Sequence, residues 1–412
     1  MRILWIVNTI FPEPAKSLNL KTGVSGGWMF DFADKAAGSG IKLAIASFYE
    51  GKHIMELEIK NITYYLLPGG SRRMMFYCRD NERLWNDINN RFSPDIVHLH
   101  GTEYSHGLAF LRAKPNIPAV VSIQGILRRI AQEYFGGISV PQLLRYRTLS
   151  ENLHLNGMIE QKLLLSRNAQ YEKEILNRVK YVHVINMWDY SVTKLINEKL
   201  KIYKYDFNLR PQFYEAKKWD INNFKRHSII TGQCSTPLKG LHILIKALEI
   251  VKKSYPDVML TVSGVMPNSG YYKYIKQLIK STNLSGNIIF AGPLDVCSII
   301  KQMQNAHIAI IPSAIEGTSM FLREAMFLGL PSIAAFRGGM ADYIKDGQSG
   351  FLYDYCEYSY LAQRITQLFG SDRLLQDFSQ GGIILSEEHH NREKNCQAML
   401  NMYNEIILEN QA

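Results

Sequence analysis

Residues 310–353 read IIPSAIEGTSMFLREAMFLGLPSIAAFRGGMADYIKDGQSGFLY. A short apolar run is followed by a helical segment that begins near Ser319, and a second apolar run begins after Pro331. Strand, helix and strand in this order are typical of the βαβ unit of a parallel sheet. Glu316 lies just outside the first strand and Glu324 lies eight positions later in the helix, a separation that returns to nearly the same helical face.

The same alternation of apolar runs and amphipathic stretches extends over most of the chain. The runs IVHLHG (96–101) and AVVSIQG (119–125) are continuously apolar and end in Gly, as buried parallel strands do. The polar, aromatic residues 201–225 have no clear period and are expected to connect two domains. We therefore predict an α/β fold of two facing, doubly wound, Rossmann-like domains with a ligand cleft between them.

We place the N-terminal domain at residues 1–205, joined by a C-terminal helix at 391–412, and the C-terminal domain at residues 206–390. The apolar start, residues 1–12, is expected to be a β-strand and not a signal peptide.

Composition excludes several classes of protein. The chain has 412 residues, of which 46% are hydrophobic and 20% are charged, so it is neither disordered nor collagen-like. The five cysteines show no CxxC spacing, which indicates a reducing compartment and no cysteine zinc site. No apolar run reaches the ~18–20 residues of a membrane-spanning helix. The net charge of +10 favours an anionic partner without identifying it.

Three loops have the composition of a phosphate site. Gly317, Thr318 and Ser319 precede Met320 at a helix start, where free backbone N–H groups and the helix dipole attract anions. In TGQCSTPLKG, Lys239 precedes a helix and supplies a point positive charge. A third loop contains Gly26 and Gly27, which allow a ligand close to the backbone at another helix start.

These motifs resemble those of the family-4 retaining glycosyltransferases, the glycosyl transferases group 1 with the GT-B fold, of the bacterial surface-polysaccharide type. The family pattern is Glu, seven residues, Glu, a small residue, Gly, Pro and a later Gly-Gly. It is matched by Glu316, Glu324, Ala325, Gly329, Pro331, Gly338 and Gly339. The resemblance implies that the N-terminal domain serves the acceptor and the C-terminal domain binds the donor. It further implies that Glu324 holds the ribose, Glu316 lies near the transferred hexose, and Gly26 and Gly27 face the donor phosphates.

Two positions depart from the family pattern. Gln233 stands where the family commonly has an Arg, so Arg210 or Arg337 is expected to substitute, or the leaving group is stabilised more weakly. Gln124 stands where many relatives have a His that contacts the donor sugar, and an amide cannot act as a general base. Arg128 lies beside Gln124 in a basic, partly apolar segment expected on the acceptor side.

The function implied by the resemblance is transfer of a sugar from a UDP- or GDP-linked donor to a glycan or polyprenyl-linked acceptor. The expected setting is capsule, exopolysaccharide or lipopolysaccharide synthesis in the cytoplasm, at the inner face of the membrane. No metal, no cofactor and no nucleic acid is expected. The residues expected to act are Glu316 and Lys239 in catalysis; Glu324, Lys239, Gln233, Gly317, Thr318, Ser319, Met320, Gly26 and Gly27 at the donor; and Gln124 and Arg128 on the acceptor or sugar side.

Alternatives remain open at this point. A sugar-nucleotide epimerase on the same fold would convert the donor alone, and a non-catalytic nucleotide or glycan binder would convert nothing. The segment GILRRIAQEYFGG (125–137) fits either an anionic membrane surface or a solvated helix face. His98 and His100 share one strand face and fit a core position better than a metal site, because no third ligand is close in the sequence.

Overall fold

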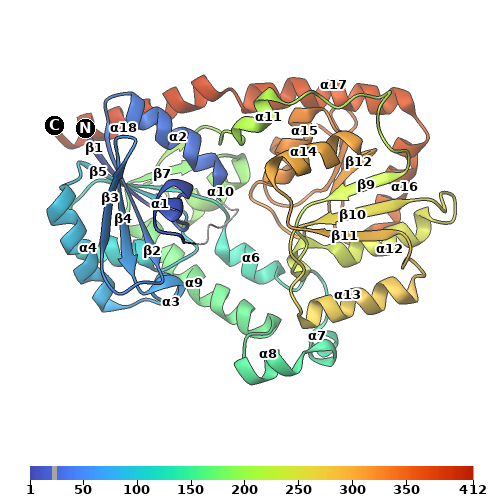
Figure 1. Cartoon of the computed structure of the whole chain (residues 1–412), viewed down its shortest axis with the longest axis horizontal. Coiled ribbons are helices and arrows are strands. Elements are labelled where there is room, and N and C mark those ends of the chain that lie inside the picture. The colour runs from blue at the N-terminus through green and yellow to red at the C-terminus, as the bar shows by residue number, and fades with distance from the viewer. Residues whose placement is uncertain (21–25, 412) are drawn as a thin grey trace. The chain divides into compact units, whose positions relative to one another are not determined.

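A computed structural model describes residues 1–20 and 26–411 of the chain (Figure 1). The chain divides into two compact units. The first comprises Met1–Leu127, Ser166–Asn208 and His390–Ala412, and the second comprises Arg128–Leu165 and Leu209–His389. The boundary predicted at residue 205 places Arg128–Leu165 in the first domain, whereas the contacts of this segment group it with the second unit.

The first unit contains an eight-stranded sheet in the order β3-β4-β2-β1-β5-β6-β7-β8 (Figure 1). Neighbouring strands pair in parallel, except that β3 runs antiparallel to β4. The strands are β1 (Arg2–Ile6), β2 (Lys42–Tyr49), β3 (Met55–Ile59), β4 (Ile62–Pro68), β5 (Ile96–His100), β6 (Ala119–Ser122), β7 (Tyr181–Val184) and β8 (Lys201–Lys204). The chain adds β2 and β4 on one side of β1 and then crosses over to add β5 and the later strands on the other side. The place between β1 and β5 is the topological switch point, where parallel sheets bind ligands beyond their carboxyl ends.

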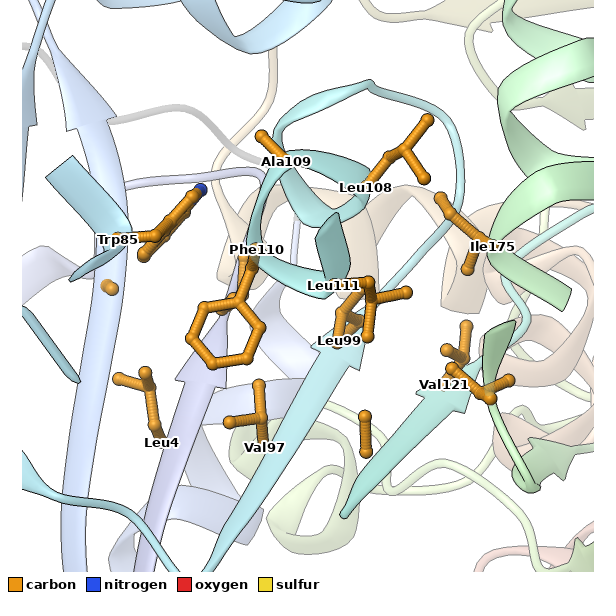
Figure 2. Packing of buried hydrophobic residues seen from close by; sticks show 14 of the residues in the cluster. Leu4, Trp85, Val97, Leu99, Leu108, Ala109, Phe110, Leu111, Val121 and Ile175 are labelled. Atoms are coloured by element: carbon orange, nitrogen blue, oxygen red, sulfur yellow. The ribbon is translucent and has the colours of Figure 1, made fainter. Parts of the chain in front are cut away.

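Helices α1 to α5 lie between the strands of this unit, and α9, α10 and α18 follow. They are α1 (Pro12–Ser17), α2 (Gly27–Gly38), α3 (Gly70–Met75), α4 (Arg79–Phe92), α5 (His106–Ala113), α9 (Met158–Arg178), whose first turns group with the second unit, α10 (Met187–Ile196) and α18 (Arg392–Gln411). The apolar runs of β1, β5 and β6 are buried under these helices. Figure 2 shows Phe110 and Leu111 of α5 above Val97 and Leu99 of β5, all of them at most 3% exposed. Burial of each such side chain contributes about 1.5–3 kcal/mol, so the α5 contact holds the end of β5 firmly.

His98 lies in the core of this unit. Its Nδ1 is 2.6 Å from the hydroxyl of Tyr403 on α18, and its Nε2 is 2.7 Å from the hydroxyl of Ser122 on β6. The indole N–H of Trp5 also donates to the Tyr403 hydroxyl, over 3.0 Å. Burial lowers the pKa of His98 well below its ordinary value, so the ring is neutral. Both ring nitrogens have partners, which makes His98 a core residue that ties α18 to the sheet.

The second unit contains a six-stranded sheet in the order β11-β10-β9-β12-β13-β14, parallel throughout. Its strands are β9 (Ser228–Thr231), β10 (Met259–Ser263), β11 (Ile288–Gly292), β12 (Ile308–Ile311), β13 (Ser332–Ala335) and β14 (Phe351–Tyr353). The chain builds from β9 toward β11 and then crosses to β12 on the other side of β9. The switch point of this sheet therefore lies between β9 and β12.

Helices lie between the successive strands of this sheet, as the alternating sequence predicts, and further helices of the unit precede β9 or follow β14 in the chain. They are α6 (Leu127–Glu133), α7 (Val140–Tyr146), α8 (Leu149–His154), α11 (Pro211–Glu215), η1 (Pro237–Lys239), α12 (Leu241–Val251), α13 (Gly270–Ser281), α14 (Val296–Asn305), α15 (Met320–Leu328), η2 (Met340–Asp342), α16 (Tyr358–Phe369) and α17 (Asp372–His389). Within residues 1–20 and 26–411, no helix has both the length and the apolar character required to cross a bilayer.

One predicted connection proves to be a strand. Residues 201–225 are expected from their irregular pattern to link two domains, but Lys201–Lys204 forms β8 and pairs in parallel with β7. β8 is the edge strand of its sheet and keeps its side chains partly exposed. Lys201 also forms an ion pair with Glu409 of α18. An exposed edge strand needs no continuous apolar run, and this is why the pattern of buried strands did not reveal it.

Candidate active site

A cavity of about 450 Å³ opens at the switch point of the second sheet. The loop after β9 forms one side, the loop after β12 another, and the first turn of α15 a third. Its lining residues are Thr231, Gly232, Gln233, Cys234, Ser235, Thr236, Lys239, Ile311, Pro312, Ser313, Glu316, Thr318, Ser319, Met320 and Phe321. Seven of these fifteen residues carry a hydroxyl or an amide, which suits a ligand rich in hydroxyl groups.

Lys239 and Glu316 meet in this cavity. The Lys239 ammonium forms an ion pair with Glu316 Oε1, and the Ser313 hydroxyl donates to the same oxygen over 2.8 Å. Burial alone would lower the pKa of Lys239, but the charge of Glu316 and its hydrogen bond outweigh burial and raise this pKa above its ordinary value. Lys239 is therefore a full positive charge at neutral pH, held beside a carboxylate that an incoming ligand can replace.

Two glycines allow this close approach of loops. Gly240 follows Lys239 with φ +70°, and a Cβ there would lie 1.6 Å from the backbone oxygen of Pro312. Gly338 has φ +65°, and a Cβ there would lie 2.0 Å from the backbone oxygen of Glu316. Gly339 N–H donates to that oxygen over 3.0 Å. The Gly-Gly pair thus fixes the backbone of Glu316, and only glycine fits at its first position.

The start of α15 faces the cavity. Ser319 is the N-cap residue, and its hydroxyl accepts from the N–H of Leu322 over 3.3 Å. Thr318, Ser319 and Met320 line the cavity, whereas Gly317 is not among the lining residues. The first N–H groups of the helix and its dipole favour an anion at this end. The helix start and Lys239 together form a site suited to a phosphate.

Glu324 lies deeper in α15 and does not line the cavity. It accepts two hydrogen bonds from Arg210, from Nε over 2.7 Å and from Nη2 over 2.8 Å, and its side chain is 5% exposed. Burial raises the pKa of Glu324 above its ordinary value although Arg210 opposes the shift. The ribose role of Glu324 stays a prediction.

The cation missing at Gln233 has no substitute among the lining residues that the structure describes. Arg210 is bound to Glu324, and Arg337 lies 3.5 Å from Asp354 outside the cavity. The amide of Gln233 donates instead to the hydroxyl of Ser235 over 3.3 Å. Lys239 is consequently the one Lys or Arg side chain in the described lining of the cavity.

Sequence reasoning missed two residues around the cavity. Ser313, which bonds to Glu316, directly follows Pro312 at the end of β12, and its place after a buried strand is a usable signal. Arg323 is 1% exposed, and its Nη1 lies 3.4 Å from the hydroxyl of Thr318. An arginine inside a helical pattern gives no such signal, because most lie on the surface.

The remaining predicted residues do not line the cavity. Gly26 is the N-cap of α2 with φ +86°, and Gly27 begins that helix in the first unit. Gln124 follows β6, also in the first unit, and is partly exposed. Arg128 is exposed on α6, but the apolar neighbours Ile126 and Leu127 are buried. Two of the apolar side chains of this segment thus pack inward, and the choice between a membrane surface and a solvated helix face stays a prediction.

A family model described as glycosyl transferases group 1 matches residues 215–383. This range contains the whole cavity, and over it the chain is similar to the family that its motifs predicted. One curated relative is the poly(ribitol-phosphate) alpha-N-acetylglucosaminyltransferase of Staphylococcus aureus (strain COL), 23% identical over 56% of this chain and 43% of the relative. The chain spans less than two thirds of the length of the first curated relatives that it matches.

Solved structures share the fold over nearly the full chain. The sucrose-phosphate synthase from Thermosynechococcus elongatus has a TM-score of 0.73 at 14% identity and covers 99% of this chain and 100% of its own. HepE of Anabaena in complex with UDP and glucose has a TM-score of 0.68 at 17% identity, with 98% and 100% covered. The predicted GT-B class of α/β fold is confirmed.

Proposed function

We propose that this chain transfers a sugar from a nucleotide diphosphate sugar to a hydroxyl of a glycan acceptor, with retention at the anomeric carbon. The observation that supports this most is the cavity in which Lys239 and the start of α15 adjoin Glu316, within the range matched by the glycosyl transferases group 1 model. A cation, helix N–H groups and a carboxylate together suit a diphosphate joined to a sugar.

In this proposal the donor diphosphate replaces Glu316 as the ion-pair partner of the Lys239 ammonium. The freed Glu316 carboxylate then accepts hydrogen bonds from hydroxyls of the sugar. The bond between the anomeric carbon and the diphosphate oxygen breaks, the acceptor oxygen bonds to that carbon, and the acceptor proton passes to the leaving phosphate. Lys239 and the α15 N–H groups stabilise the negative charge that grows on the leaving group.

We further propose that the reaction needs no metal ion and that the donor carries uracil or guanine. The sequence contains no Asp-x-Asp triplet, the motif that commonly holds a divalent cation in the other transferase fold. HepE is described in complex with UDP and glucose, which supports a uracil donor first. The proposed acceptor is a growing surface polysaccharide or lipopolysaccharide, and the proposed place is the cytoplasmic face of the membrane, where nucleotide sugars are made.

The first experiment is thermal unfolding of the whole chain with UDP, GDP or ADP and then with their sugar conjugates. A ligand at ~100 times its dissociation constant adds about 2.7 kcal/mol, and we expect UDP or GDP to raise Tm by roughly 3 °C for a chain of this length. The matching donor is then incubated with a glycan acceptor in EDTA, and the anomeric configuration of the product is read by NMR. We expect an α-linked product from an α-linked donor, at an unchanged rate in EDTA.

Other outcomes distinguish the alternatives. Conversion of the donor sugar without an acceptor would identify an epimerase. A nucleotide-induced rise in Tm without any conversion would identify a binder, and no rise with any nucleotide would contradict the proposed donor site.

We also propose that the α7–α8 segment, residues 139–155, rests on an anionic membrane surface. Leu149 and Leu153 lie one helical turn apart on α8 and are 86% and 80% exposed. Both acidic groups near them are engaged, since Glu151 is buried against Gly270 N–H and Glu160 pairs with Arg147. Arg145 stays exposed. The outer face of this segment is therefore apolar and basic, as in interfacial helices.

Replacing Leu149 and Leu153 together by serine is expected to lower binding to vesicles that contain phosphatidylglycerol about tenfold or more, because each buried leucine contributes about 1.5–3 kcal/mol. Co-sedimentation measures the bound fraction. The matched control is Leu195→Ser, since Leu195 on α10 is 87% exposed. Equal binding by the double variant and by the control would contradict the membrane proposal.

A further inference from the structure

The first unit repeats at its own switch point the arrangement that forms the cavity in the second. In the second unit, a carboxylate (Glu316) follows the strand at the switch point, β12. In the first unit, β1 and β5 flank the switch point, and each is followed there by a polar side chain: Asn8 after β1 and Glu103 after β5. The carboxyl ends of strands at a switch point are the place where such sheets bind ligands.

Glu103 is held there by neighbours on several elements. The Asn8 side-chain amide donates to Glu103 Oε2 over 3.0 Å. The Asn168 amide of α9 donates to the backbone oxygen of Glu103 over 3.0 Å, and the Thr102 hydroxyl donates to Glu172 of the same helix over 2.7 Å. The loop that carries the carboxylate is thus fixed on both sides of its backbone.

Gly101 leaves the space that this carboxylate occupies. Its φ is +102°, and a Cβ at this position would lie 2.0 Å from Glu103 Oε2 and 2.8 Å from the amide nitrogen of Asn8. Any other residue would both strain the backbone and push Glu103 and Asn8 apart. The contact between Asn8 and Glu103 therefore depends on the local backbone and is not a chance surface contact.

The charge of Glu103 is not neutralised within the described part of the chain, where no ion pair includes it. Two other sheltered carboxylates have arginine partners, Glu324 with Arg210 and Asp31 with Arg392, whereas Glu151 and Glu172 accept from N–H or hydroxyl donors as Glu103 does. Burial raises the pKa of Glu103 to about 7, against the opposing effect of the backbone N–H groups of residues 102 and 103 and of the Asn8 amide. A partly desolvated carboxylate without a cation is costly for folding, which favours a role in binding.

The titratable groups near Glu103 do not supply the missing charge. His100, at the end of β5, and His106, at the start of α5, both have pKa values lowered by burial, so they are neutral. Burial raises the pKa of Tyr104, which is neutral too. Glu172 on α9 is bonded to Thr102 and has the same sign as Glu103. Among residues 1–20 and 26–411, the neighbouring groups named here are therefore neutral side chains and one further carboxylate.

We propose that Asn8 and Glu103 form a hydroxyl-binding subsite for the carbohydrate acceptor of the first unit, an assignment that rests on the proposed transfer. The carboxylate accepts hydrogen bonds from sugar hydroxyls, and the second N–H and the oxygen of the Asn8 amide offer one donor and one acceptor beside it. An unpaired carboxylate repels phosphate groups, so the ligand at this point is a neutral sugar ring and not a sugar phosphate.

The test measures binding of four methyl glycosides to the full chain: the glucoside, galactoside, mannoside and N-acetylglucosaminide. Saturation-transfer-difference NMR is the readout. Glu103→Gln keeps the shape of the side chain and removes its charge. We expect at least one glycoside to bind the wild type and to bind this variant about 10- to 100-fold more weakly, the range for a hydrogen bond to a charged group. The matched control is Glu58→Gln, since Glu58 is exposed on β3 and outside this site.

Two further readouts separate a binding role from a structural one. The same variant is expected to keep the nucleotide-induced rise in Tm, and to have its own Tm at pH 8 raised by about 2 °C, because a desolvated charge is removed. In the wild type, glycoside binding should weaken as pH falls through about 7, and the variant should lose this dependence. Unchanged glycoside binding in Glu103→Gln, or no binding of any glycoside to the wild type, would overturn the subsite. These binding measurements need no donor turnover, so they fail independently of the proposed transfer reaction.

Discussion

Replacing Lys239 by methionine is expected to lower kcat/KM for sugar transfer about 10²- to 10³-fold. Methionine keeps most of the length of the side chain and removes its charge, the one Lys or Arg in the described lining of the cavity. Loss of a single preorganised group that stabilises growing negative charge typically has an effect of this size. Initial rates over a range of donor concentrations measure it, and kcat should fall more than KM rises, because the charge is greatest in the transition state.

The control for this prediction is Lys253→Met, which removes an exposed lysine just beyond α12. The companion variant Glu316→Gln tests the ion pair from its other side. It frees Lys239 from a competing anion, so UDP or GDP should bind at least as tightly as to the wild type while turnover falls. A Lys239→Met variant that kept more than about a tenth of the wild-type kcat/KM would contradict the proposed role of Lys239 in leaving-group stabilisation.

The sequence predicted the two parallel sheets because their strands are short, continuously apolar and separated by amphipathic helices. It did not predict β8, since Lys201–Lys204 is an exposed edge strand. It also could not tell which side of α6 is buried. Ile126 and Leu127 face the interior, whereas the exposed apolar face of this region lies on α8 at Leu149 and Leu153. An amphipathic pattern defines two faces without saying which of them meets solvent.

Motif spacing predicted which residues lie in the cavity more reliably than which residues contact one another. Glu316 and Lys239 were both expected at the donor site, and the structure brings them into contact. The pairing of Arg210 with Glu324 spans 114 positions, and no local period can reveal a contact of that kind. The same holds for Asn8 and Glu103, which are 95 positions apart and meet only because β1 and β5 are neighbours in the sheet.

Replacing Arg210 by methionine is expected to lower the free energy of unfolding by about 3–5 kcal/mol, nearer the lower end because the Arg210 side chain is 25% exposed. The variant leaves Glu324, 5% exposed, without its two charge-assisted hydrogen bonds. A buried carboxylate without a partner must either remain charged in a poorly solvated place or take up a proton. Urea unfolding followed by circular dichroism at pH 5 and pH 8 measures the loss.

Two controls separate charge burial from a general loss of packing. Arg91→Met removes one member of an exposed ion pair with Asp87 and should leave the free energy of unfolding almost unchanged. The double variant Arg210→Met with Glu324→Gln no longer buries a charge and should recover part of the loss of the single variant. If the single variant unfolds within about 1 kcal/mol of the wild type, the pair contributes far less than its burial indicates.

The contribution of Glu324 to the free energy of unfolding depends on pH. Burial already raises the pKa of Glu324 in the folded chain, so the folded state holds its proton more tightly than the unfolded chain, and stability from this group is lost as pH rises through the folded pKa. Without Arg210 the opposing contribution disappears and the pKa of Glu324 rises further, so the variant should lose more stability than the wild type between pH 5 and pH 8.

The variant Glu324→Gln then tests the ribose-binding role predicted for this residue. If Glu324 also holds the ribose, the rise in Tm with UDP or GDP shrinks in this variant; if the carboxylate serves only to bind Arg210, the rise is unchanged although the variant itself is less stable.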